Sequence, residues 1–299
     1  VRQPALGVLT VNVPCVSWAS CLLIILLGCG KNSSSIEPDL THKIIGQTGG
    51  NSKERASNKE PLNAREQFEG FLTKAKSGDV DAATKTADNY AAGRGVEIDF
   101  EKAVKWYRVA AEHGEDRAQY NLGYMYYNGE GLPLDYKLAV EWFTKAAVQG
   151  NAGAQTNLGL MYDSGDGVPE DNKKALFWFR RAAVQGEPMA QFNVGWMYDN
   201  GEGVAKDKAK ALEWYIKSSH GGNIEAPNFV AILYDTGEGI ERDVIAAHAW
   251  WSIGERRGDQ APRNNLEFLE QKMTEAQIAE AKKLAAKLEA EMAPKDDDE

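Results

Sequence analysis

One set of residues returns five times along this chain at a constant spacing of 36 residues. Each unit contains a Gly-x-Gly pair followed by a tryptophan. The glycine pairs are Gly93/Gly95, Gly129/Gly131, Gly165/Gly167, Gly201/Gly203 and Gly237/Gly239, and the tryptophans are Trp106, Trp142, Trp178, Trp214 and Trp250. A repeat of this length is typical of a solenoid, in which each unit buries its apolar surface only against its neighbours. The period therefore predicts the fold class, and it favours a binding function.

Each unit has the pattern of two amphipathic helices. In the second unit, small and apolar residues recur at helical spacing over residues 118–126 and again over residues 139–147. Gly129 follows the first helix, where a left-handed C-cap is expected, and Asp135 precedes the second helix as an N-cap. Gly123 is glycine or alanine in every unit, which indicates the close approach of a second helix. The sequence predicts an all-α fold, with no strand in this region.

The consensus A-x-x-x-L-G-x-x-Y-x-x-G-x-G-V-x-x-D-x-x-K-A-x-x-W-Y-x-K-A-A-x-x-G resembles the Sel1-like repeat, a relative of the tetratricopeptide repeat. This resemblance implies a right-handed α-solenoid over residues 80–255, with helix–turn–helix units at 80–115, 116–151, 152–187, 188–223 and 224–255. The outer units depart from the consensus, with Thr86-Ala87 replacing Leu-Gly in the first and Pro227 and Ala231 in the fifth. Atypical terminal units are expected of a capped array.

The segments around the array differ from it in composition. Residues 63–79 predict an N-terminal capping helix, and residues 256–293 predict C-terminal capping helices, the last opened by a capping box from Thr274 to Gln277. Residues 29–62 are rich in polar residues and glycine, and they predict a flexible tether. The charged residues 294–299 predict a disordered acidic tail.

The amino-terminal residues 1–28 predict a signal peptide. The apolar run Val11–Leu27 is shorter than the roughly 20 residues that span a bilayer. Leu26-Leu27-Gly28-Cys29 resembles the lipobox of bacterial lipoproteins, which implies lipidation of Cys29 and membrane anchoring on the periplasmic side of the envelope. The residue after Cys29 is Gly30, and not the aspartate that retains lipoproteins in the inner membrane of enteric bacteria. This favours the outer membrane. A plain secretory signal, giving a secreted or soluble periplasmic protein, and an uncleaved signal anchor are the alternatives.

Charge and cysteine usage exclude several classes of function. The chain has 34 basic and 44 acidic residues and a net charge of −10, so we expect no nucleic-acid partner, because phosphate neutralisation dominates that binding. The cysteines Cys15, Cys21 and Cys29 all lie at or before the expected cleavage site. We therefore expect neither disulfides nor a thiolate metal site in the folded part.

The sequence contains no convincing catalytic motif. The four histidines lack metal-ligand spacing, and His248 replaces an apolar residue of the other units, so we expect it to pack in the interior. Ser-x-x-Lys and Lys-Thr-Gly are absent, and Lys85-Thr86-Ala87 is the nearest match. We predict no cofactor, no metal and a non-catalytic protein-interaction scaffold. The alternative is an envelope enzyme that acts on peptidoglycan or β-lactams.

The resemblance places the first helix of each unit on the concave face of the array. Three positions of each first helix are not needed for the core: two before, two after and five after the repeated apolar residue, which is Leu122 in the second unit. We therefore expect them to contact a protein or peptide partner. These positions also include Thr156 and Asn228, and the ten others are the candidate binding residues. We call those ten the first-helix strip: Tyr120, Tyr124, Tyr127, Leu160, Asp163, Phe192, Trp196, Asp199, Ile232 and Asp235. The alternative is that Tyr124, Leu160 and Trp196 pack against the next repeat. We also expect the repeated tryptophans to be core residues.

Overall fold

The computed structural model describes residues 63–293. This part of the chain is an all-α solenoid of thirteen helices without a strand, as the sequence predicted. The expectations for the signal peptide, Cys29, the tether and the tail 294–299 fall outside the described residues. None of the helices within 63–293 is both long and apolar enough to cross a membrane.

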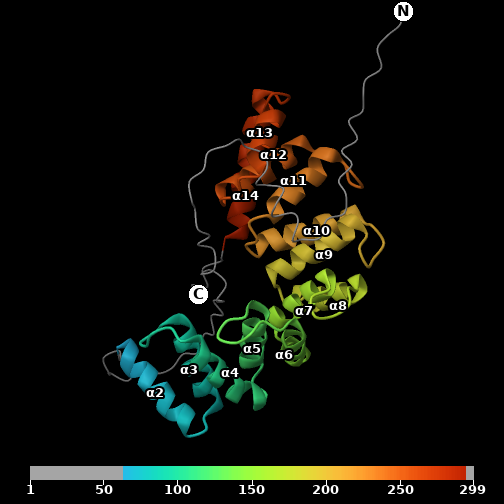
Figure 1. The fold of residues 1–299 in the computed structure, drawn as a ribbon. Coiled ribbons are helices and arrows are strands. Elements are labelled where there is room, and N and C mark those ends of the chain that lie inside the picture. The colour runs from blue at the N-terminus through green and yellow to red at the C-terminus, as the bar shows by residue number, and fades with distance from the viewer. Residues whose placement is uncertain (1–62, 294–299) are drawn as a thin grey trace, which may run out of the picture. The chain divides into compact units, whose positions relative to one another are not determined.

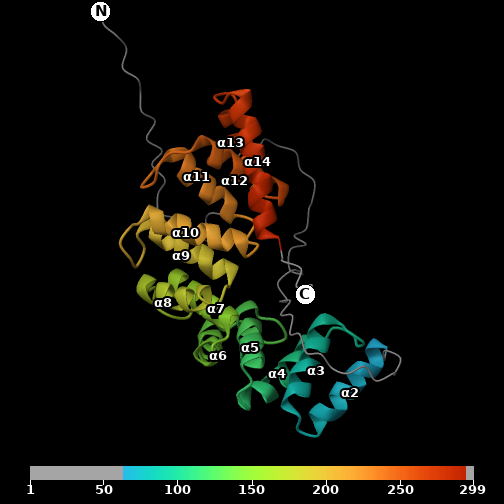
Figure 2. The same cartoon turned by 180° about the vertical axis from the view of Figure 1, so that it is seen from behind.

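Five helix pairs form the array, with one helix before it and two after it. Helix α2 (Ala64–Lys76) precedes the pairs, and α13 (Pro262–Glu270) and α14 (Glu275–Met292) follow them. The pairs are α3 (Val80–Ala92) with α4 (Phe100–Glu112), α5 (Asp116–Asn128) with α6 (Tyr136–Gln149), α7 (Ala152–Ser164) with α8 (Asn172–Ala183), α9 (Pro188–Asn200) with α10 (Lys208–His220), and α11 (Ala226–Thr236) with α12 (Val244–Arg256). Most helices pack chiefly against their neighbours in sequence, and α14 packs against α12 (Figures 1 and 2).

Local sequence sets the ends of these helices. Gly129 ends α5 with a φ of 72°, a left-handed conformation that costs glycine little. Asp135 caps α6, since its carboxylate accepts a hydrogen bond from the Leu138 amide at 3.0 Å. The Asp135 amide donates to the carbonyl of Tyr126 at 2.9 Å, which closes the connection between the two helices. Both predicted caps are confirmed, and so is the capping box that begins at Thr274.

The mid-helix glycines receive an aromatic ring from the second helix of the same unit. A Cβ atom at Gly123 would lie 2.8 Å from the Phe143 ring, and one at Gly159 would lie 2.5 Å from the Phe179 ring. Real Cβ atoms essentially never approach another heavy atom this closely. The predicted close approach is confirmed, and its cause is a buried ring on the facing helix.

The expectation that the repeated tryptophans form the core is wrong for most of them. Trp106, Trp142, Trp178 and Trp214 are only half-buried, and the Lys145 ammonium lies 3.8 Å from the centre of the Trp142 ring. The residue after each tryptophan is buried instead, as with Phe143, which is 1% exposed. Adjacent helical residues point about 100° apart, so only one of the two can face the first helix.

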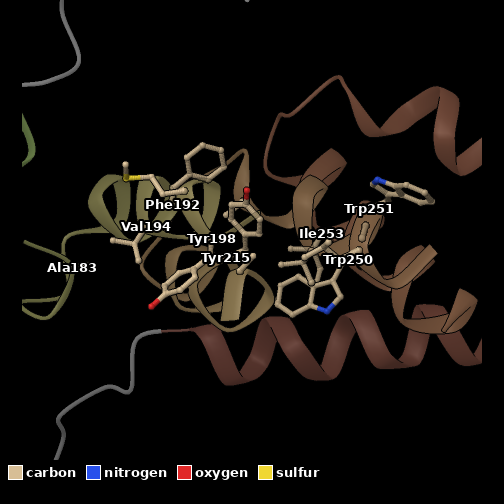
Figure 3. Close-up of a cluster of buried hydrophobic side chains, with 14 of the residues drawn as sticks. Ala183, Phe192, Val194, Tyr198, Tyr215, Trp250, Trp251 and Ile253 are labelled. Carbon is tan, nitrogen blue, oxygen red and sulfur yellow. The ribbon is translucent and has the colours of Figure 1, made fainter. Parts of the chain in front are cut away.

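The last repeat is the exception to this rule. Trp250 and Trp251 are each 3% exposed, and they lie on α12, the helix against which α13 and α14 pack. Figure 3 shows both rings, with Ile253, in the same buried cluster as Tyr215.

Candidate functional site

The first-helix strip lies on four successive first helices, α5, α7, α9 and α11. The residue of each unit that corresponds to Leu122 faces the core, and Leu122 itself is fully buried. The strip residues lie beside this core position in each unit. Nine of the ten strip residues are half-buried, and Phe192 is buried. The structure therefore presents the strip as side chains with one face packed and one face accessible.

Three tyrosines form the α5 part of the strip. The ring of Tyr120 lies 5.8 Å from that of Phe143, and the ring of Tyr127 lies 5.2 Å from that of Tyr136. Burial raises the pKa of the Tyr120 hydroxyl, and a hydrogen bond with Asn157 of the next repeat partly offsets this rise. Tyr124 packs against the same apolar cluster. Packing fixes these rings in place, so a partner would meet them with little ordering cost.

Phe192 is a core residue, so the expectation that it faces a partner is wrong. It is 1% exposed, and its ring lies 5.4 Å from Tyr215 and 5.0 Å from Phe229 (Figure 3 shows Phe192 near Tyr215). Phe229 occupies the position that is asparagine in the three preceding repeats. This aromatic substitution in the fifth repeat supplies the ring that covers Phe192.

Trp196 also contacts Phe229, but it remains half-buried. The two rings meet edge to face with their centres 5.9 Å apart. Burial raises the pKa of Glu202, and a hydrogen bond from Trp196 to that carboxylate works in the opposite direction. Leu160 and Ile232 are half-buried as well, and they pack against the central apolar cluster. The alternative in which such residues pack against a neighbouring repeat is thus partly realised, because each keeps one accessible face.

Two of the three strip aspartates are neutralised within the chain. Lys208 pairs with Asp199, and its ammonium lies 3.1 Å from the Glu238 carboxylate. Burial lowers the pKa of Lys208, but the hydrogen bonds and charges of these two carboxylates raise it above its ordinary value. Asp235 pairs with Arg242 at 2.9 Å. Both aspartates are therefore in ion pairs, although the repeat pattern alone suggested that they are available to a partner.

Asp163 is different, since no ion pair within residues 63–293 involves it. Burial, together with the negative charges of Glu202 and Glu170, raises the pKa of Asp163 to about 6. The strip therefore contains one local concentration of uncompensated negative charge, beside Trp196, whose indole is hydrogen-bonded to the Glu202 carboxylate. A cationic side chain placed there would relieve the repulsion.

Replacing Asp163 with asparagine is expected to stabilise the protein at neutral pH but not in acid. The folded state holds the proton more tightly than the unfolded state, so the stability linked to this group is present below about pH 4 and is lost as pH rises through about 6. After allowance for solvent screening, we expect a gain of about 1 kcal/mol at about pH 7.5. Urea unfolding at about pH 4.5 and about pH 7.5 measures it. A gain that is equal at both pH values would contradict the assignment.

The interior also contains a contact between a histidine, a serine and a glutamate. His248 is 1% exposed, as expected for an interior residue, and its Nε2 lies 2.8 Å from Glu270 Oε1. Ser252 Oγ lies 3.3 Å from His248 Nδ1 and donates to the His248 carbonyl at 2.8 Å. The Ser252 hydroxyl already donates to a backbone carbonyl of its own helix, so we assign it no catalytic role. The contact between His248 and Glu270 links α12 to α13. The described residues include no cluster of three His, Cys, Asp or Glu side chains that could hold a metal.

Sequence reasoning missed three residues that shape the strip. Phe229 covers Phe192, Lys208 neutralises Asp199, and Glu202 accepts from Trp196. Phe229 breaks a pattern, because its position is asparagine in the three preceding repeats. That departure was the signal that could have identified it, whereas the position of Lys208 varies from repeat to repeat and gave no such signal.

The helix pairs and their partly accessible aromatic strip define a helical-repeat protein with an interaction-type surface. Residues 80–115, 116–151, 152–187, 188–223 and 224–259 each match the Sel1 repeat family. The chain belongs to this family.

Two solved structures are similar over most of the described residues. The Sel1 repeat protein from Oxalobacter formigenes is 31% identical, with a TM-score of 0.65, over 75% of this chain and 93% of that protein. A protective antigen present in uropathogenic Escherichia coli strains, which displays an SLR fold, is 35% identical with a TM-score of 0.68. That similarity covers 77% of this chain, which spans about half (49%) of the antigen. No curated protein matches the chain.

Proposed function

We propose that this Sel1 repeat protein is a non-catalytic scaffold that binds a protein or peptide partner along the first-helix strip. The observation that carries the proposal is the row of half-buried side chains on the first helices of four successive repeats, each with one face fixed by the core. Such fixed aromatic surfaces are the usual anchors of binding energy, because little conformational entropy is lost on association.

The chemistry of the strip indicates what kind of segment it would bind. Tyr124, Leu160 and Trp196 offer apolar contact, and Asp163 and Glu202 offer negative charge at one place. An extended or helical segment with apolar residues and one lysine or arginine fits this combination. The cation would also relieve the electrostatic repulsion that helps to raise the pKa of Asp163.

Replacing Trp196 with alanine is expected to weaken the binding of such a partner by about 2 kcal/mol, since tryptophan is enriched at binding hot spots. A benzophenone side chain at Tyr124 first captures the partner from the native envelope, and surface plasmon resonance then compares wild type with Trp196→Ala. The control is Val148→Ala, an exposed position on α6. Circular dichroism checks the fold of each variant. Normal binding by folded Trp196→Ala would place the partner elsewhere.

The same preparation tests the enzymatic alternative. Nitrocefin and muropeptides are incubated with the purified protein and with Ser252→Ala, which removes the hydroxyl beside His248. We expect no turnover by either protein. Turnover that disappears in folded Ser252→Ala would replace the scaffold proposal with a hydrolase.

We also propose that the protein is a lipoprotein of the bacterial envelope, anchored through Cys29 and facing the periplasm. The support is sequence alone: the lipobox-like Leu26-Leu27-Gly28-Cys29 and the polar residues 29–62 after it.

The change Cys29→Ser is expected to abolish uptake of labelled palmitate and to leave a soluble or uncleaved product. One acyl chain gives only marginal membrane binding, whereas two or more give stable attachment. Membrane fractionation of cells that express wild type or variant measures the difference. If the wild type fractionates as a soluble periplasmic protein, the secretory alternative is correct.

A further inference from the structure

The outer face of α8 exposes large apolar side chains between arginines. Phe177 is 52% exposed and Val184 is 76% exposed. With Leu176 and three basic residues they line a shallow depression of about 390 Å³. We call the exposed members the α8 patch: Lys173, Phe177, Arg180, Arg181 and Val184.

Aromatic rings hold both arginines of the patch. The Arg181 guanidinium lies 5.7 Å from the centre of the Phe177 ring and 5.5 Å from that of Trp178, and those two rings meet edge to face at 5.0 Å. Arg180 donates to the Tyr198 hydroxyl and lies over its ring. Neither arginine is in an ion pair with a carboxylate of residues 63–293. Both planar cations are therefore positioned, but their charge is uncompensated.

The patch is an exception within an acidic protein. Helix α8 has four basic residues and no acidic residue, whereas the whole chain has a net charge of −10. The repeat fold does not require this composition, because the position of Phe177 is Glu141 in α6 and Glu213 in α10. The position of Arg180 is Thr144 in α6. The exposed phenylalanine is thus specific to this repeat, whereas Arg180 has a counterpart in Arg108 of α4, which donates in the same way to the Tyr126 hydroxyl at 3.1 Å.

We propose that the α8 patch is a second docking surface, which binds an acidic amphipathic segment of a protein partner. Carboxylates of the segment would pair with Arg180 and Arg181, and its apolar side chains would cover Phe177 and Val184. Charge complementarity selects this occupant. A symmetric pairing of two copies through the patch is disfavoured, since it would bring two surfaces of the same positive charge together. The surface lies on a second helix and is independent of the first-helix strip.

The test uses the full-length protein and two synthetic probes. Each probe is a fluorescein-labelled amphipathic helix with a leucine stripe; glutamates flank the stripe in one and lysines in the other. Fluorescence anisotropy is measured at low and high ionic strength. We expect the glutamate probe to bind and to weaken as salt rises; on Trp196→Ala protein, in which the first-helix strip is impaired, it should bind at least about tenfold more tightly than the lysine probe.

The decisive variant is Phe177→Glu combined with Arg180→Thr. It installs the residues that α6 has at the same positions, Glu141 and Thr144, so the fold is expected to persist. We expect it to weaken the glutamate probe at least about tenfold. Val148→Glu, which changes an exposed residue of α6, is the matched control and is expected to change binding by less than about twofold. Trp196→Ala is expected to leave probe binding unchanged, which separates this result from the strip.

Five results would overturn the proposal. Equal binding of both probes to Trp196→Ala protein, or full binding of the glutamate probe by the folded double variant, would show that the patch does not recognise acidic segments. Displacement of the glutamate probe by phosphatidylglycerol vesicles would assign the patch to a membrane surface. Tighter probe binding after Asp296, Asp297 and Asp298 are changed to asparagine would identify the chain's own tail as the occupant. A dimer in sedimentation that Phe177→Glu dissociates would identify a second copy.

Discussion

Replacing Phe143 with alanine is expected to lower the free energy of unfolding by about 3–5 kcal/mol, as for other large aromatic residues removed from cores. Phe143 is 1% exposed, and its ring fills the space left by Gly123 on the facing helix. The truncation would leave a cavity that the glycine cannot fill. Trp142→Ala, for which the repeat pattern alone suggested a loss of this size, is expected to cost only about 1–2 kcal/mol, because its ring is half-buried.

Urea unfolding of the two variants, followed by circular dichroism, measures both losses. The slope of each transition should match that of the wild type, which shows that the same cooperative unit unfolds. If Trp142→Ala costs as much as Phe143→Ala, the assignment of the core to the second aromatic of each pair is wrong.

Replacing Gly167 with alanine is expected to cost about 3 kcal/mol or more, whereas Gly165→Ala is expected to cost about 1 kcal/mol. Both glycines have a positive φ, of 70° and 78°, so both substitutions force an unfavourable backbone conformation. They differ in surroundings. A Cβ atom at Gly167 would lie 2.5 Å from the Tyr136 carbonyl oxygen, but one at Gly165 would meet nothing closer than 3.5 Å.

The pair of substitutions isolates this contact between repeats. Tyr136 is the first residue of α6, so Gly167 lies against the second helix of the preceding unit. Thermal and urea unfolding compare the two variants under the same conditions. Equal losses would mean that only the backbone conformation matters at these positions, and that the repeats do not meet through the second glycine.

Much of the architecture was predictable from the sequence because its causes are local. The 36-residue period, the glycine C-caps and the aspartate N-caps act within a few residues of their own helix ends. The structure confirms Gly129 and Asp135 in these roles. The mid-helix glycine pattern also predicted close helix approach correctly, since only a small residue tolerates a ring at that distance.

The first-helix strip was less predictable, because burial depends on residues far away in the sequence. The repeat pattern put Phe192 on the accessible face, but Phe229 from the next unit covers it. It treated Asp163 and Asp199 alike, yet Lys208 of α10 neutralises only Asp199. Asp163 instead lies near other carboxylates, which helps to raise its pKa.

The sequence by itself therefore determined the repeat, the all-α class and the caps at the helix ends, because these follow from backbone capping and from periodic apolar residues. Only the tertiary structure decided which of two adjacent aromatics, such as Trp142 and Phe143, fills the core. It also decided which strip charges remain uncompensated. Both depend on the side chains that neighbouring helices bring within contact distance, and a single side chain, such as Phe229 or Lys208, changes the outcome.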